Sequence, residues 1–280
     1  MITDAQTNLL YLSDRLSTKQ KPFYDRFTAL LEANGLRYAA LPATRDIWAR
    51  DYMPVQVAQQ KFVRFVYDPS YLKAQKWRLT ITDAAEVCAA IGIEAAAVPI
   101  VLDGGNVVKD AQQVIVTTRV FEENPQYTEK ELLRALEAAL EVERVIVVPR
   151  QPYDYTGHAD GILRFVDAHT VLVNAYKAGE NATFLRNLAL SLHNAGLKTE
   201  EIPYAPGDLL QKLTGAGGLY INYLHLGDTI VLPVFGIAAD EIAERRMHAL
   251  FPGHRILTID CRELAPEGGL LHCISWNILQ

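Results

Sequence analysis

A cysteine near the end of the sequence has the surroundings of a nucleophile. Cys273 follows the pair Gly268-Gly269, and residues without a Cβ let the backbone turn sharply or come close to a ligand. An ordinary thiol is mostly protonated at neutral pH, so a reactive one needs a cationic neighbour. We expect Cys88 and Cys261 to be packing thiols, because one falls in a predicted helix and the other directly follows a predicted strand.

Three loops elsewhere in the chain collect polar residues. The first contains Trp48, Arg50 and Asp51. Its carboxylate can accept two parallel N–H bonds from a guanidinium, while the indole face suits the rest of such a ligand. A surface Arg–Asp pair beside a core Trp is the ordinary alternative. The second loop, Asp103 to Asn106, is by itself a good turn.

The third loop pairs an imidazole with a carboxylate. Between Gly157 and Asp160, a strand would place His158 and Asp160 on one face, and imidazole beside carboxylate is the pairing expected of a general acid/base. A lone histidine in a loop is more often structural. Each of the three loops, taken alone, therefore leaves a structural and a chemical interpretation open.

Composition narrows the classes of function. The 280 residues are half hydrophobic and carry a net charge of −6, which argues against nucleic acid and is compatible with a cationic small substrate. Three cysteines and seven scattered histidines lack metal-ligand spacing, so we expect neither a disulfide framework nor a zinc site. No apolar run is long enough to span a membrane, and the first residues do not resemble a secretory signal. We therefore expect a cytoplasmic protein without a membrane partner.

Alternating strands and helices must position these loops. Apolar residues at helical spacing predict helices over residues 21–34, 82–91, 128–140, 182–195 and 239–250, the third with Thr128 and Glu131 as a capping box. Apolar runs predict strands over residues 9–12, 38–42, 62–67, 98–102, 114–117, 145–148, 163–166, 171–173, 219–226, 229–234 and 255–259. Strand, strand, helix, strand units thus recur without a linker between them. We expect one α/β domain over residues 1–280.

Taken together, the polar segments resemble the guanidino-group-modifying superfamily, the pentein fold. They are most similar to its agmatine deiminase and bacterial peptidyl-arginine deiminase branch. The matching segments are Asp46 to Pro54, Asp103 to Asn106, Gly157 to Phe165 and Gly268 to Cys273, in the same order as in that branch. The resemblance implies a five-bladed α/β propeller of pseudo-symmetric ββαβ units, with the site in a central channel.

The resemblance also implies a role for each matching residue. Cys273 corresponds to the nucleophile and His158 to the general acid/base. Asp51 and Asp160 correspond to the two carboxylates that bind the guanidinium, and Trp48 lies beside the first of them in the sequence.

Three departures from the branch concern the substrate more than the chemistry. Asp103 stands where deiminases usually have a Glu that orients the histidine, and the amidinotransferase branch has Asp there. Met53 replaces a usual Gly, and the Trp-rich opening of agmatine deiminases is missing. We expect Asp103 to keep the orienting role despite its shorter arm.

The reaction implied is deimination of agmatine to N-carbamoylputrescine and ammonia through an amidino-cysteine intermediate. Water is the second substrate, so no cofactor is expected. Free, peptidyl or methylated arginine remain alternative substrates, and an amidinotransferase or a non-catalytic pentein that only binds remain alternative functions. His272 also neighbours Cys273, but adjacent side chains of an extended segment point to opposite faces, so we expect it to be structural. A homodimer stays an open option.

Overall fold

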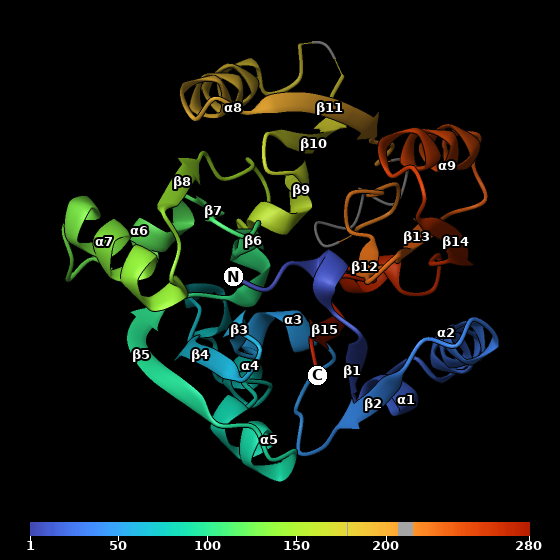
Figure 1. The fold of residues 1–280 in the computed structure, drawn as a ribbon, viewed down its shortest axis with the longest axis horizontal. Coiled ribbons are helices and arrows are strands. Elements are labelled where there is room, and N and C mark those ends of the chain that lie inside the picture. Colours follow the sequence, from blue (N-terminus) through green and yellow to red (C-terminus); the bar gives the residue numbers. More distant parts are fainter. Residues whose placement is uncertain (178, 207–214) are drawn as a thin grey trace.

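The strands of the protein form a ring of small sheets around a central axis. The computed structural model describes residues 1–177, 179–206 and 215–280. In these ranges there are five sheets of three strands each, with the longer helices at the periphery (Figure 1). This arrangement is the predicted five-bladed α/β propeller.

Every sheet has the same internal order. Its middle strand pairs antiparallel with a strand near the axis and parallel with a strand at the rim (Figure 1). From the axis outward, the sheets are β15 (Ser275–Ile278), β1 (Leu9–Ser13) and β2 (Tyr38–Leu41); β3 (Val55–Ala58), β4 (Lys61–Val66) and β5 (Ala95–Val101); β6 (Val108–Lys109), β7 (Gln113–Thr117) and β8 (Arg144–Val148); β9 (Leu163–Asp167), β10 (Thr170–Ala175) and β11 (Lys198–Pro203); β12 (Leu224–Leu226), β13 (Thr229–Val234) and β14 (Arg255–Asp260).

A helix joins the middle strand of each sheet to its outer strand. A parallel pair needs such a crossover because the chain must return to the end from which it started. The crossover helices are α2 (Lys21–Ala33), α5 (Ala84–Ala90), α7 (Glu129–Leu140), α8 (Ala182–Asn194) and α9 (Ala239–Leu250). Shorter helices are α1 (Leu16–Lys19), α3 (Ala49–Tyr52), α4 (Gln75–Arg78) and α6 (Arg119–Glu123). None of the helices in the described ranges has the length and apolar character needed to cross a membrane.

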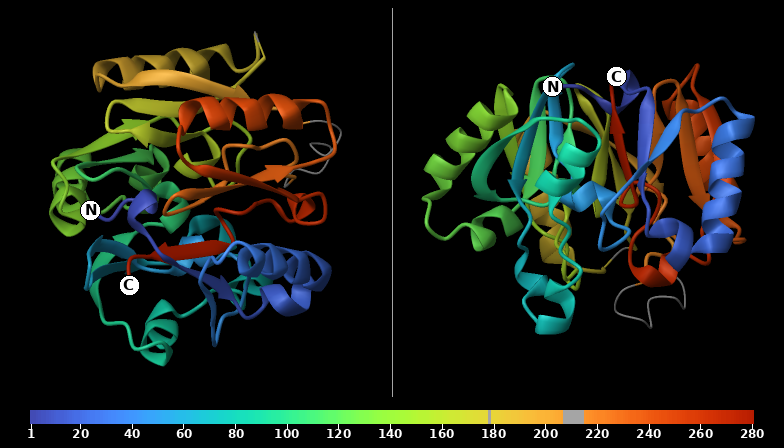
Figure 2. Two further views of the ribbon diagram at one scale, coloured as in Figure 1. Left: turned by 45° about the vertical axis from the view of Figure 1, so that its right-hand side comes forward. Right: turned by 90° about the horizontal axis from the view of Figure 1, so that it is seen from below.

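The two ends of the chain close the ring together. β15, from the C-terminus, pairs antiparallel with β1, from the N-terminus, with Leu9 opposite Ile278 and Leu12 opposite Ser275. Both termini lie at the same face of the ring, the upper face in the right-hand view of Figure 2. The residues just before β15 are therefore held against the first blade.

The core lies between the sheets and the helices that cover them. All residues of β1 and β7 are buried, because a strand that is covered on both faces excludes water from both. α2 buries Phe23, Phe27 and Leu31, which recur at helical spacing and pack with Leu10 and Leu12 in one apolar cluster.

The sequence prediction missed or misplaced several strands. The inner strands β3, β6 and β15 and the outer strand β11 were not predicted. The strand predicted over residues 219–226 is confined to Leu224–Leu226, because residues 220–222 form turns instead. The missed inner strands have four residues or fewer, too few for a period to show, and β11 has no apolar run.

The predicted capping box at the start of α7 is present and can be tested. The Thr128 hydroxyl accepts a hydrogen bond from the Glu131 amide at 3.3 Å, and Glu131 Oε2 accepts one from the Thr128 amide at 3.0 Å. Thr128→Ala should lower the free energy of unfolding by about 1 kcal/mol, as loss of an N-cap does. Urea denaturation measures this loss.

The matched control is Thr183→Ala in the first turn of α8. Thr183 is exposed, and its side chain has no described hydrogen bond. The control should change the free energy of unfolding by less than about 0.5 kcal/mol. Equal losses in the two variants would contradict a stabilising role for the capping box.

Candidate active site

Five segments meet near the axis of the ring, and each one directly precedes an inner strand. Asp51 lies in α3, before β3, and Asp103 lies before β6. His158 and Asp160 come before β9, and Cys273 before β15. Because the inner strands surround the axis, their leading ends bring these side chains together. The remaining inner strand, β12, is preceded by Asn222, which the sequence analysis did not identify as a site residue.

Cys273 is held by Asn222 on one side and faces a carboxylate on the other. Asn222 Nδ2 donates to Cys273 Sγ at 3.1 Å, and Asn222 Oδ1 accepts from the amides of Leu270 and Cys273 at 3.2 and 3.3 Å. The thiol lies 3.6 Å from Asp160 Oδ2. Cys273 is partly buried, whereas Cys88 and Cys261 are buried. Among the three cysteine residues, Cys273 is therefore the most exposed.

His158 bridges two carboxylates. Its Nε2 lies 2.8 Å from Asp103 Oδ2, and its Nδ1 lies 3.6 Å from Asp51 Oδ1. Burial alone would lower the pKa of His158, but Asp51 and Asp103 raise it to about 10. The ring is therefore an imidazolium at neutral pH, and Nδ1 is the nitrogen free for proton transfer because Asp103 occupies Nε2.

The site holds more acidic groups than its one imidazolium can keep ionised. Burial, together with nearby Asp103 and Asp160, raises the pKa of Asp51 to about 8 against the opposing effect of His158. Burial likewise raises the pKa of Asp160. The pKa of the Cys273 thiol is well above its ordinary value because of burial and the nearby carboxylates Asp160 and Asp51. A cation bound between the carboxylates would reverse these shifts.

Two glycines let the segments approach each other. A Cβ on Gly269 would lie 2.6 Å from Trp48 Cζ3 and 3.0 Å from Cys273 Cβ, so the indole packs directly beside the loop that carries Cys273. A Cβ on Gly105 would lie 2.5 Å from His158 Nδ1, and the Gly105 amide donates to Asp51 Oδ1 at 3.1 Å. The Gly-Gly pairs therefore serve close approach.

The structure corrects two arguments made from the sequence. His158 and Asp160 do not share a strand face, because residues Ala159–Gly161 form a 3₁₀ turn that aims both side chains toward the site. His272 and Cys273 do not lie on an extended segment, because residues 271–274 form turns. His272 is buried, and its Nε2 lies 3.9 Å from Asp160 Oδ2. Burial and two nearby guanidinium groups, those of Arg164 and Arg50, lower the pKa of His272 well below its ordinary value.

Tyr71 is a second residue that the sequence analysis did not identify. Its hydroxyl donates to Asp103 Oδ2 at 2.8 Å, and its ring meets the His158 ring edge-on with centroids 6.1 Å apart. It comes from a 3₁₀ turn, Ser70–Leu72, between β4 and α5. No motif points to Tyr71, whereas the fivefold repeat could have pointed to Asn222.

Three arginines, Arg119, Arg150 and Arg164, have carboxylate partners within the protein. Arg119 Nη2 lies 2.6 Å from Glu123, and Arg150 Nε lies 3.3 Å from Glu122. Arg164 Nη2 lies 2.6 Å from Asp4. Across the described ranges, no group of three or more His, Cys, Asp or Glu residues is arranged to hold a metal ion.

Comparison with known proteins agrees with this architecture. Five ββαβ units around a channel are the pentein fold, and the solved structure of C. jejuni agmatine deiminase superposes with a TM-score of 0.83 at 16% identity, covering 100% of this chain and 95% of that one. The sequence profile of the family described as Porphyromonas-type peptidyl-arginine deiminase matches residues 5–278. The chain belongs to this family.

The match between this chain and a curated sequence relative covers part of each protein. A protein of Mycoplasma mycoides subsp. mycoides named "Putative agmatine deiminase" is 26% identical over 223 residues, which cover 69% of this chain and 61% of the relative. The match thus spans less than two thirds of the length of that relative.

The close approach at Gly105 makes a testable prediction. Gly105→Ala should lower the free energy of unfolding by about 1–3 kcal/mol, because the added methyl collides with His158 and Asp51 and the packed loops must shift. Gly161→Ala, in the neighbouring 3₁₀ turn, has nothing within 4 Å of the added Cβ and serves as control. It should leave the free energy of unfolding in urea unchanged or raise it by about 0.4–1 kcal/mol. Equal losses in both variants would disprove the packing argument.

The contact between Asn222 and the thiol makes a second prediction. The hydrogen bond from Asn222 lowers the pKa of Cys273 against the larger effect of burial, so Asn222→Ala should raise the pKa of the thiol. Alkylation of Cys273 by iodoacetamide, followed as a function of pH, should then need a higher pH. Cys273→Ala gives the background from Cys88 and Cys261. An unchanged pH profile would show that Asn222 does not act on the thiolate.

Proposed function

We propose that the protein is a hydrolase that deiminates a small cationic guanidino substrate, with agmatine as the preferred one. One observation carries the proposal: a thiol, an imidazolium and a pair of buried carboxylates converge at the axis. Cys273 Sγ lies 3.6 Å from Asp160, while His158 lies within 3.6 Å of Asp51. A guanidinium is the cation that suits this set, because each carboxylate can accept its N–H groups in one plane.

Asp51 and Asp160 are the proposed guanidinium ligands. Asp160 is buried and Asp51 is nearly so. Burial raises the pKa of both, so the nearby cations, above all His158, do not fully offset the loss of water. The guanidinium would replace the lost water and restore charge balance. Trp48, packed on Gly269 beside the nucleophile, gives the substrate an aromatic wall.

The substrate itself activates the nucleophile in this proposal. Burial and the carboxylates Asp160 and Asp51 keep the free thiol protonated. A guanidinium bound to those carboxylates removes their repulsion and adds a positive charge beside Sγ. Both effects lower the pKa of Cys273, so the thiolate forms when the substrate is present.

The proposed reaction has two halves. The Cys273 thiolate attacks the central carbon of the guanidinium, and the imidazolium of His158 gives its proton to the departing nitrogen, which leaves as ammonia. The neutral His158 then takes a proton from water, and the resulting hydroxide attacks the amidino-cysteine carbon. The C–S bond breaks, its electron pair returns to Cys273 as the thiolate, and the proton of the added hydroxyl is released to solvent, which leaves a neutral ureido group. For agmatine the product is N-carbamoylputrescine.

Asp103 and Tyr71 position the acid/base in this scheme. Asp103 reaches His158 at 2.8 Å, so the shorter Asp arm spans the distance for which most relatives of the agmatine deiminase branch use Glu. The Tyr71 hydroxyl donates to the same carboxylate oxygen and holds it toward the ring. This pairing keeps Nδ1 of His158 free for the substrate and supports hydrolysis despite the Asp at position 103.

The pairing of the protein's arginines favours agmatine over arginine as substrate. Arginine has an α-carboxylate that would need a cationic side chain as its partner, whereas agmatine has no α-carboxylate. Arg119, Arg150 and Arg164 are each paired with a carboxylate of the protein. The net charge of −6 also favours a doubly charged cation. The structure of the C. jejuni agmatine deiminase with substrate bound, in a variant with Cys replaced by Ser, is consistent with a cysteine nucleophile in a related fold.

The test is ammonia release from a panel of agmatine, arginine, a blocked peptidyl arginine and dimethylarginine. Agmatine should release ammonia fastest, and Cys273→Ala should lower the rate to background because the covalent step is lost. Cys261→Ala is the matched control and should keep the activity, since that thiol is buried away from the site.

Other outcomes have defined meanings. Faster release from another member of the panel would overturn the choice of agmatine. If no substrate releases ammonia but amine acceptors yield amidino products, the protein is an amidinotransferase. If both reactions are absent and a haloacetamidine labels Cys273, Cys88 and Cys261 equally, the protein binds its ligand without catalysis.

A further inference from the structure

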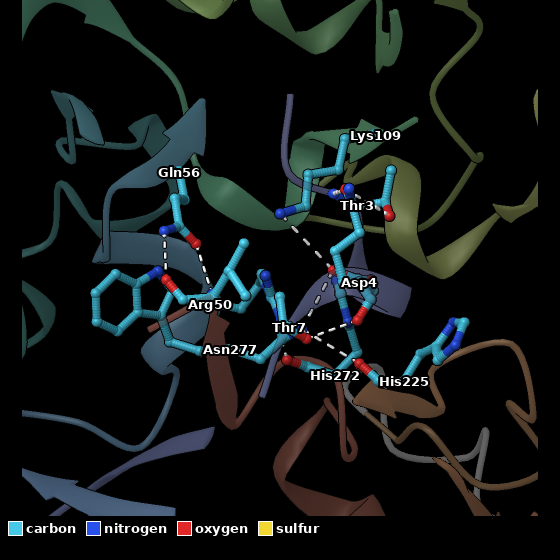
Figure 3. A network of polar contacts seen from close by, with 12 residues as sticks. Thr3, Asp4, Thr7, Arg50, Gln56, Lys109, His225, His272 and Asn277 are labelled. Atoms are coloured by element: carbon cyan, nitrogen blue, oxygen red, sulfur yellow. Dashed lines mark hydrogen bonds and ion pairs between the residues drawn. The ribbon is translucent and has the colours of Figure 1, made fainter. Parts of the chain in front are cut away.

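A second cluster of charged side chains lies along the axis beyond the proposed active site. Arg50 and Arg164 are buried, and Asp4 and Lys109 are nearly so. Asp4 of the N-terminal 3₁₀ turn, Arg50 of α3 and Lys109 of β6 gather around Asn277 of β15 (Figure 3), and Arg164 of β9 joins them through Asp4. β15 begins two residues after Cys273 and runs to the face of the ring where both termini lie (Figure 2). The cluster thus lies between the nucleophile loop and that face.

The contacts within the cluster are well defined. Asp4 accepts hydrogen bonds from Arg164 Nη2 at 2.6 Å and from Asn277 Nδ2 at 3.3 Å, and Lys109 Nζ lies 3.8 Å from its carboxylate. Arg50 Nη2 donates to Asn277 Oδ1 at 2.6 Å, and Arg50 Nε donates to a backbone carbonyl at 3.4 Å. The Lys109 ammonium has Asp4 as its partner of opposite charge, and their separation of 3.8 Å between Nζ and Oδ1 makes this a long contact.

Positive charge exceeds negative charge in this cluster. Arg50, Lys109 and Arg164 contribute three cations. Asp4 pairs with Lys109 and Arg164, and Asp160 of the proposed active site is a second carboxylate whose charge acts on Arg50 and Arg164. Burial lowers the pKa of Lys109 to about 8, which still leaves most of the ammonium charged at neutral pH. His225 and His272 add no charge, because burial lowers the pKa of both. A buried charge without a partner is unfavourable, so a counterion is favoured.

A cavity adjoins Arg50 and Lys109, the two cations of the cluster with the weakest contacts to Asp4. It has a volume of about 20 Å³, and its polar lining comes from Arg50, Lys109, Gln56 and Asn277. A space of roughly 10–15 Å³ on the same measure holds one water-sized particle. The cavity is therefore large enough for a monatomic ion and too small for phosphate, sulfate or a carboxylate metabolite.

We propose that this cavity binds a small monovalent anion, of the size and charge of chloride, between Lys109 and Arg50. The amide groups of Gln56 and Asn277 already bond within the protein, so the two cations supply the attraction. The site is distinct from the guanidinium site, which is built from carboxylates and attracts the opposite charge. The proposal does not depend on the deiminase activity.

The anion would support the nucleophile loop through Arg50. The Arg50 amide donates to the Cys273 carbonyl at 3.1 Å, and its side chain donates to the His272 carbonyl. The Arg50 carbonyl lies against Gly104, next to Asp103. An ion that neutralises the Arg50 guanidinium would therefore stabilise Arg50 in this position, where it contacts two of the loops of the proposed active site.

The direct test is a crystal structure of the whole chain grown or soaked in sodium bromide, with anomalous diffraction at the bromine edge. An anomalous peak is expected in the cavity between Lys109 and Arg50. Bromide elsewhere on the surface with none in this cavity would overturn the proposal, and so would a water refined at the position.

Solution measurements give an independent test with a matched control. At constant ionic strength, replacing gluconate by chloride should raise the melting temperature of the wild type by about 2–4 °C, because the ion binds the folded state alone. Lys109→Met should abolish this difference. Lys198→Met removes an exposed lysine without described side-chain contacts and should keep the difference. The same chloride effect in all three proteins would contradict a site at Lys109.

Discussion

Desolvation at the axis of the ring is the constraint on which the rest of the structure depends. The leading ends of five inner strands meet there, and their polar side chains are removed from water whether or not they are charged. Burial disfavours charge, so each ionised group needs a partner or shifts its pKa. The protein meets this constraint with two clusters of opposite sign: carboxylates around His158, and cations around Asp4. Short helix α3 joins them, because Arg50 faces one cluster and its neighbour Asp51 the other.

The carboxylate cluster shows how unfavourable charge can prepare a binding site. Burial disfavours the ionised forms of Asp51 and Asp160, and the guanidinium of the proposed substrate would relieve that cost. Because the same carboxylates hold the Cys273 thiol in its protonated form, the cation that relieves them also activates the nucleophile. Substrate binding and thiolate formation are thereby one electrostatic event in the proposed mechanism. A resting thiol that stays protonated is also protected from oxidation, since the thiolate is the reactive form.

Closure of the ring by the chain ends gives the nucleophile its position. β15 completes the first blade, and Leu9 to Leu12 pair with it in antiparallel register. Asn277 of the same strand donates to Asp4 and Thr7, so the first residues of the chain are fastened beside the axis. The N-terminal segment is therefore part of the structure that supports Cys273 through β15 and Arg50, although it carries none of the proposed catalytic groups.

The sequence by itself determined the residue types and the local elements. Strong apolar runs such as β7 and β13, the capping box of α7 and the polar segments containing Asp51, Asp103, His158 and Cys273 could all be predicted, because each depends on neighbours within a few residues. The structure brings these side chains to one place, and their chemical roles stay predictions. Only the tertiary structure decided that Asn222 holds the thiol, that Tyr71 holds Asp103, and that Lys109 meets Asp4 across 105 residues of chain. Such contacts join different blades, and their energy comes from burial and charge at an axis that no single segment of the sequence contains.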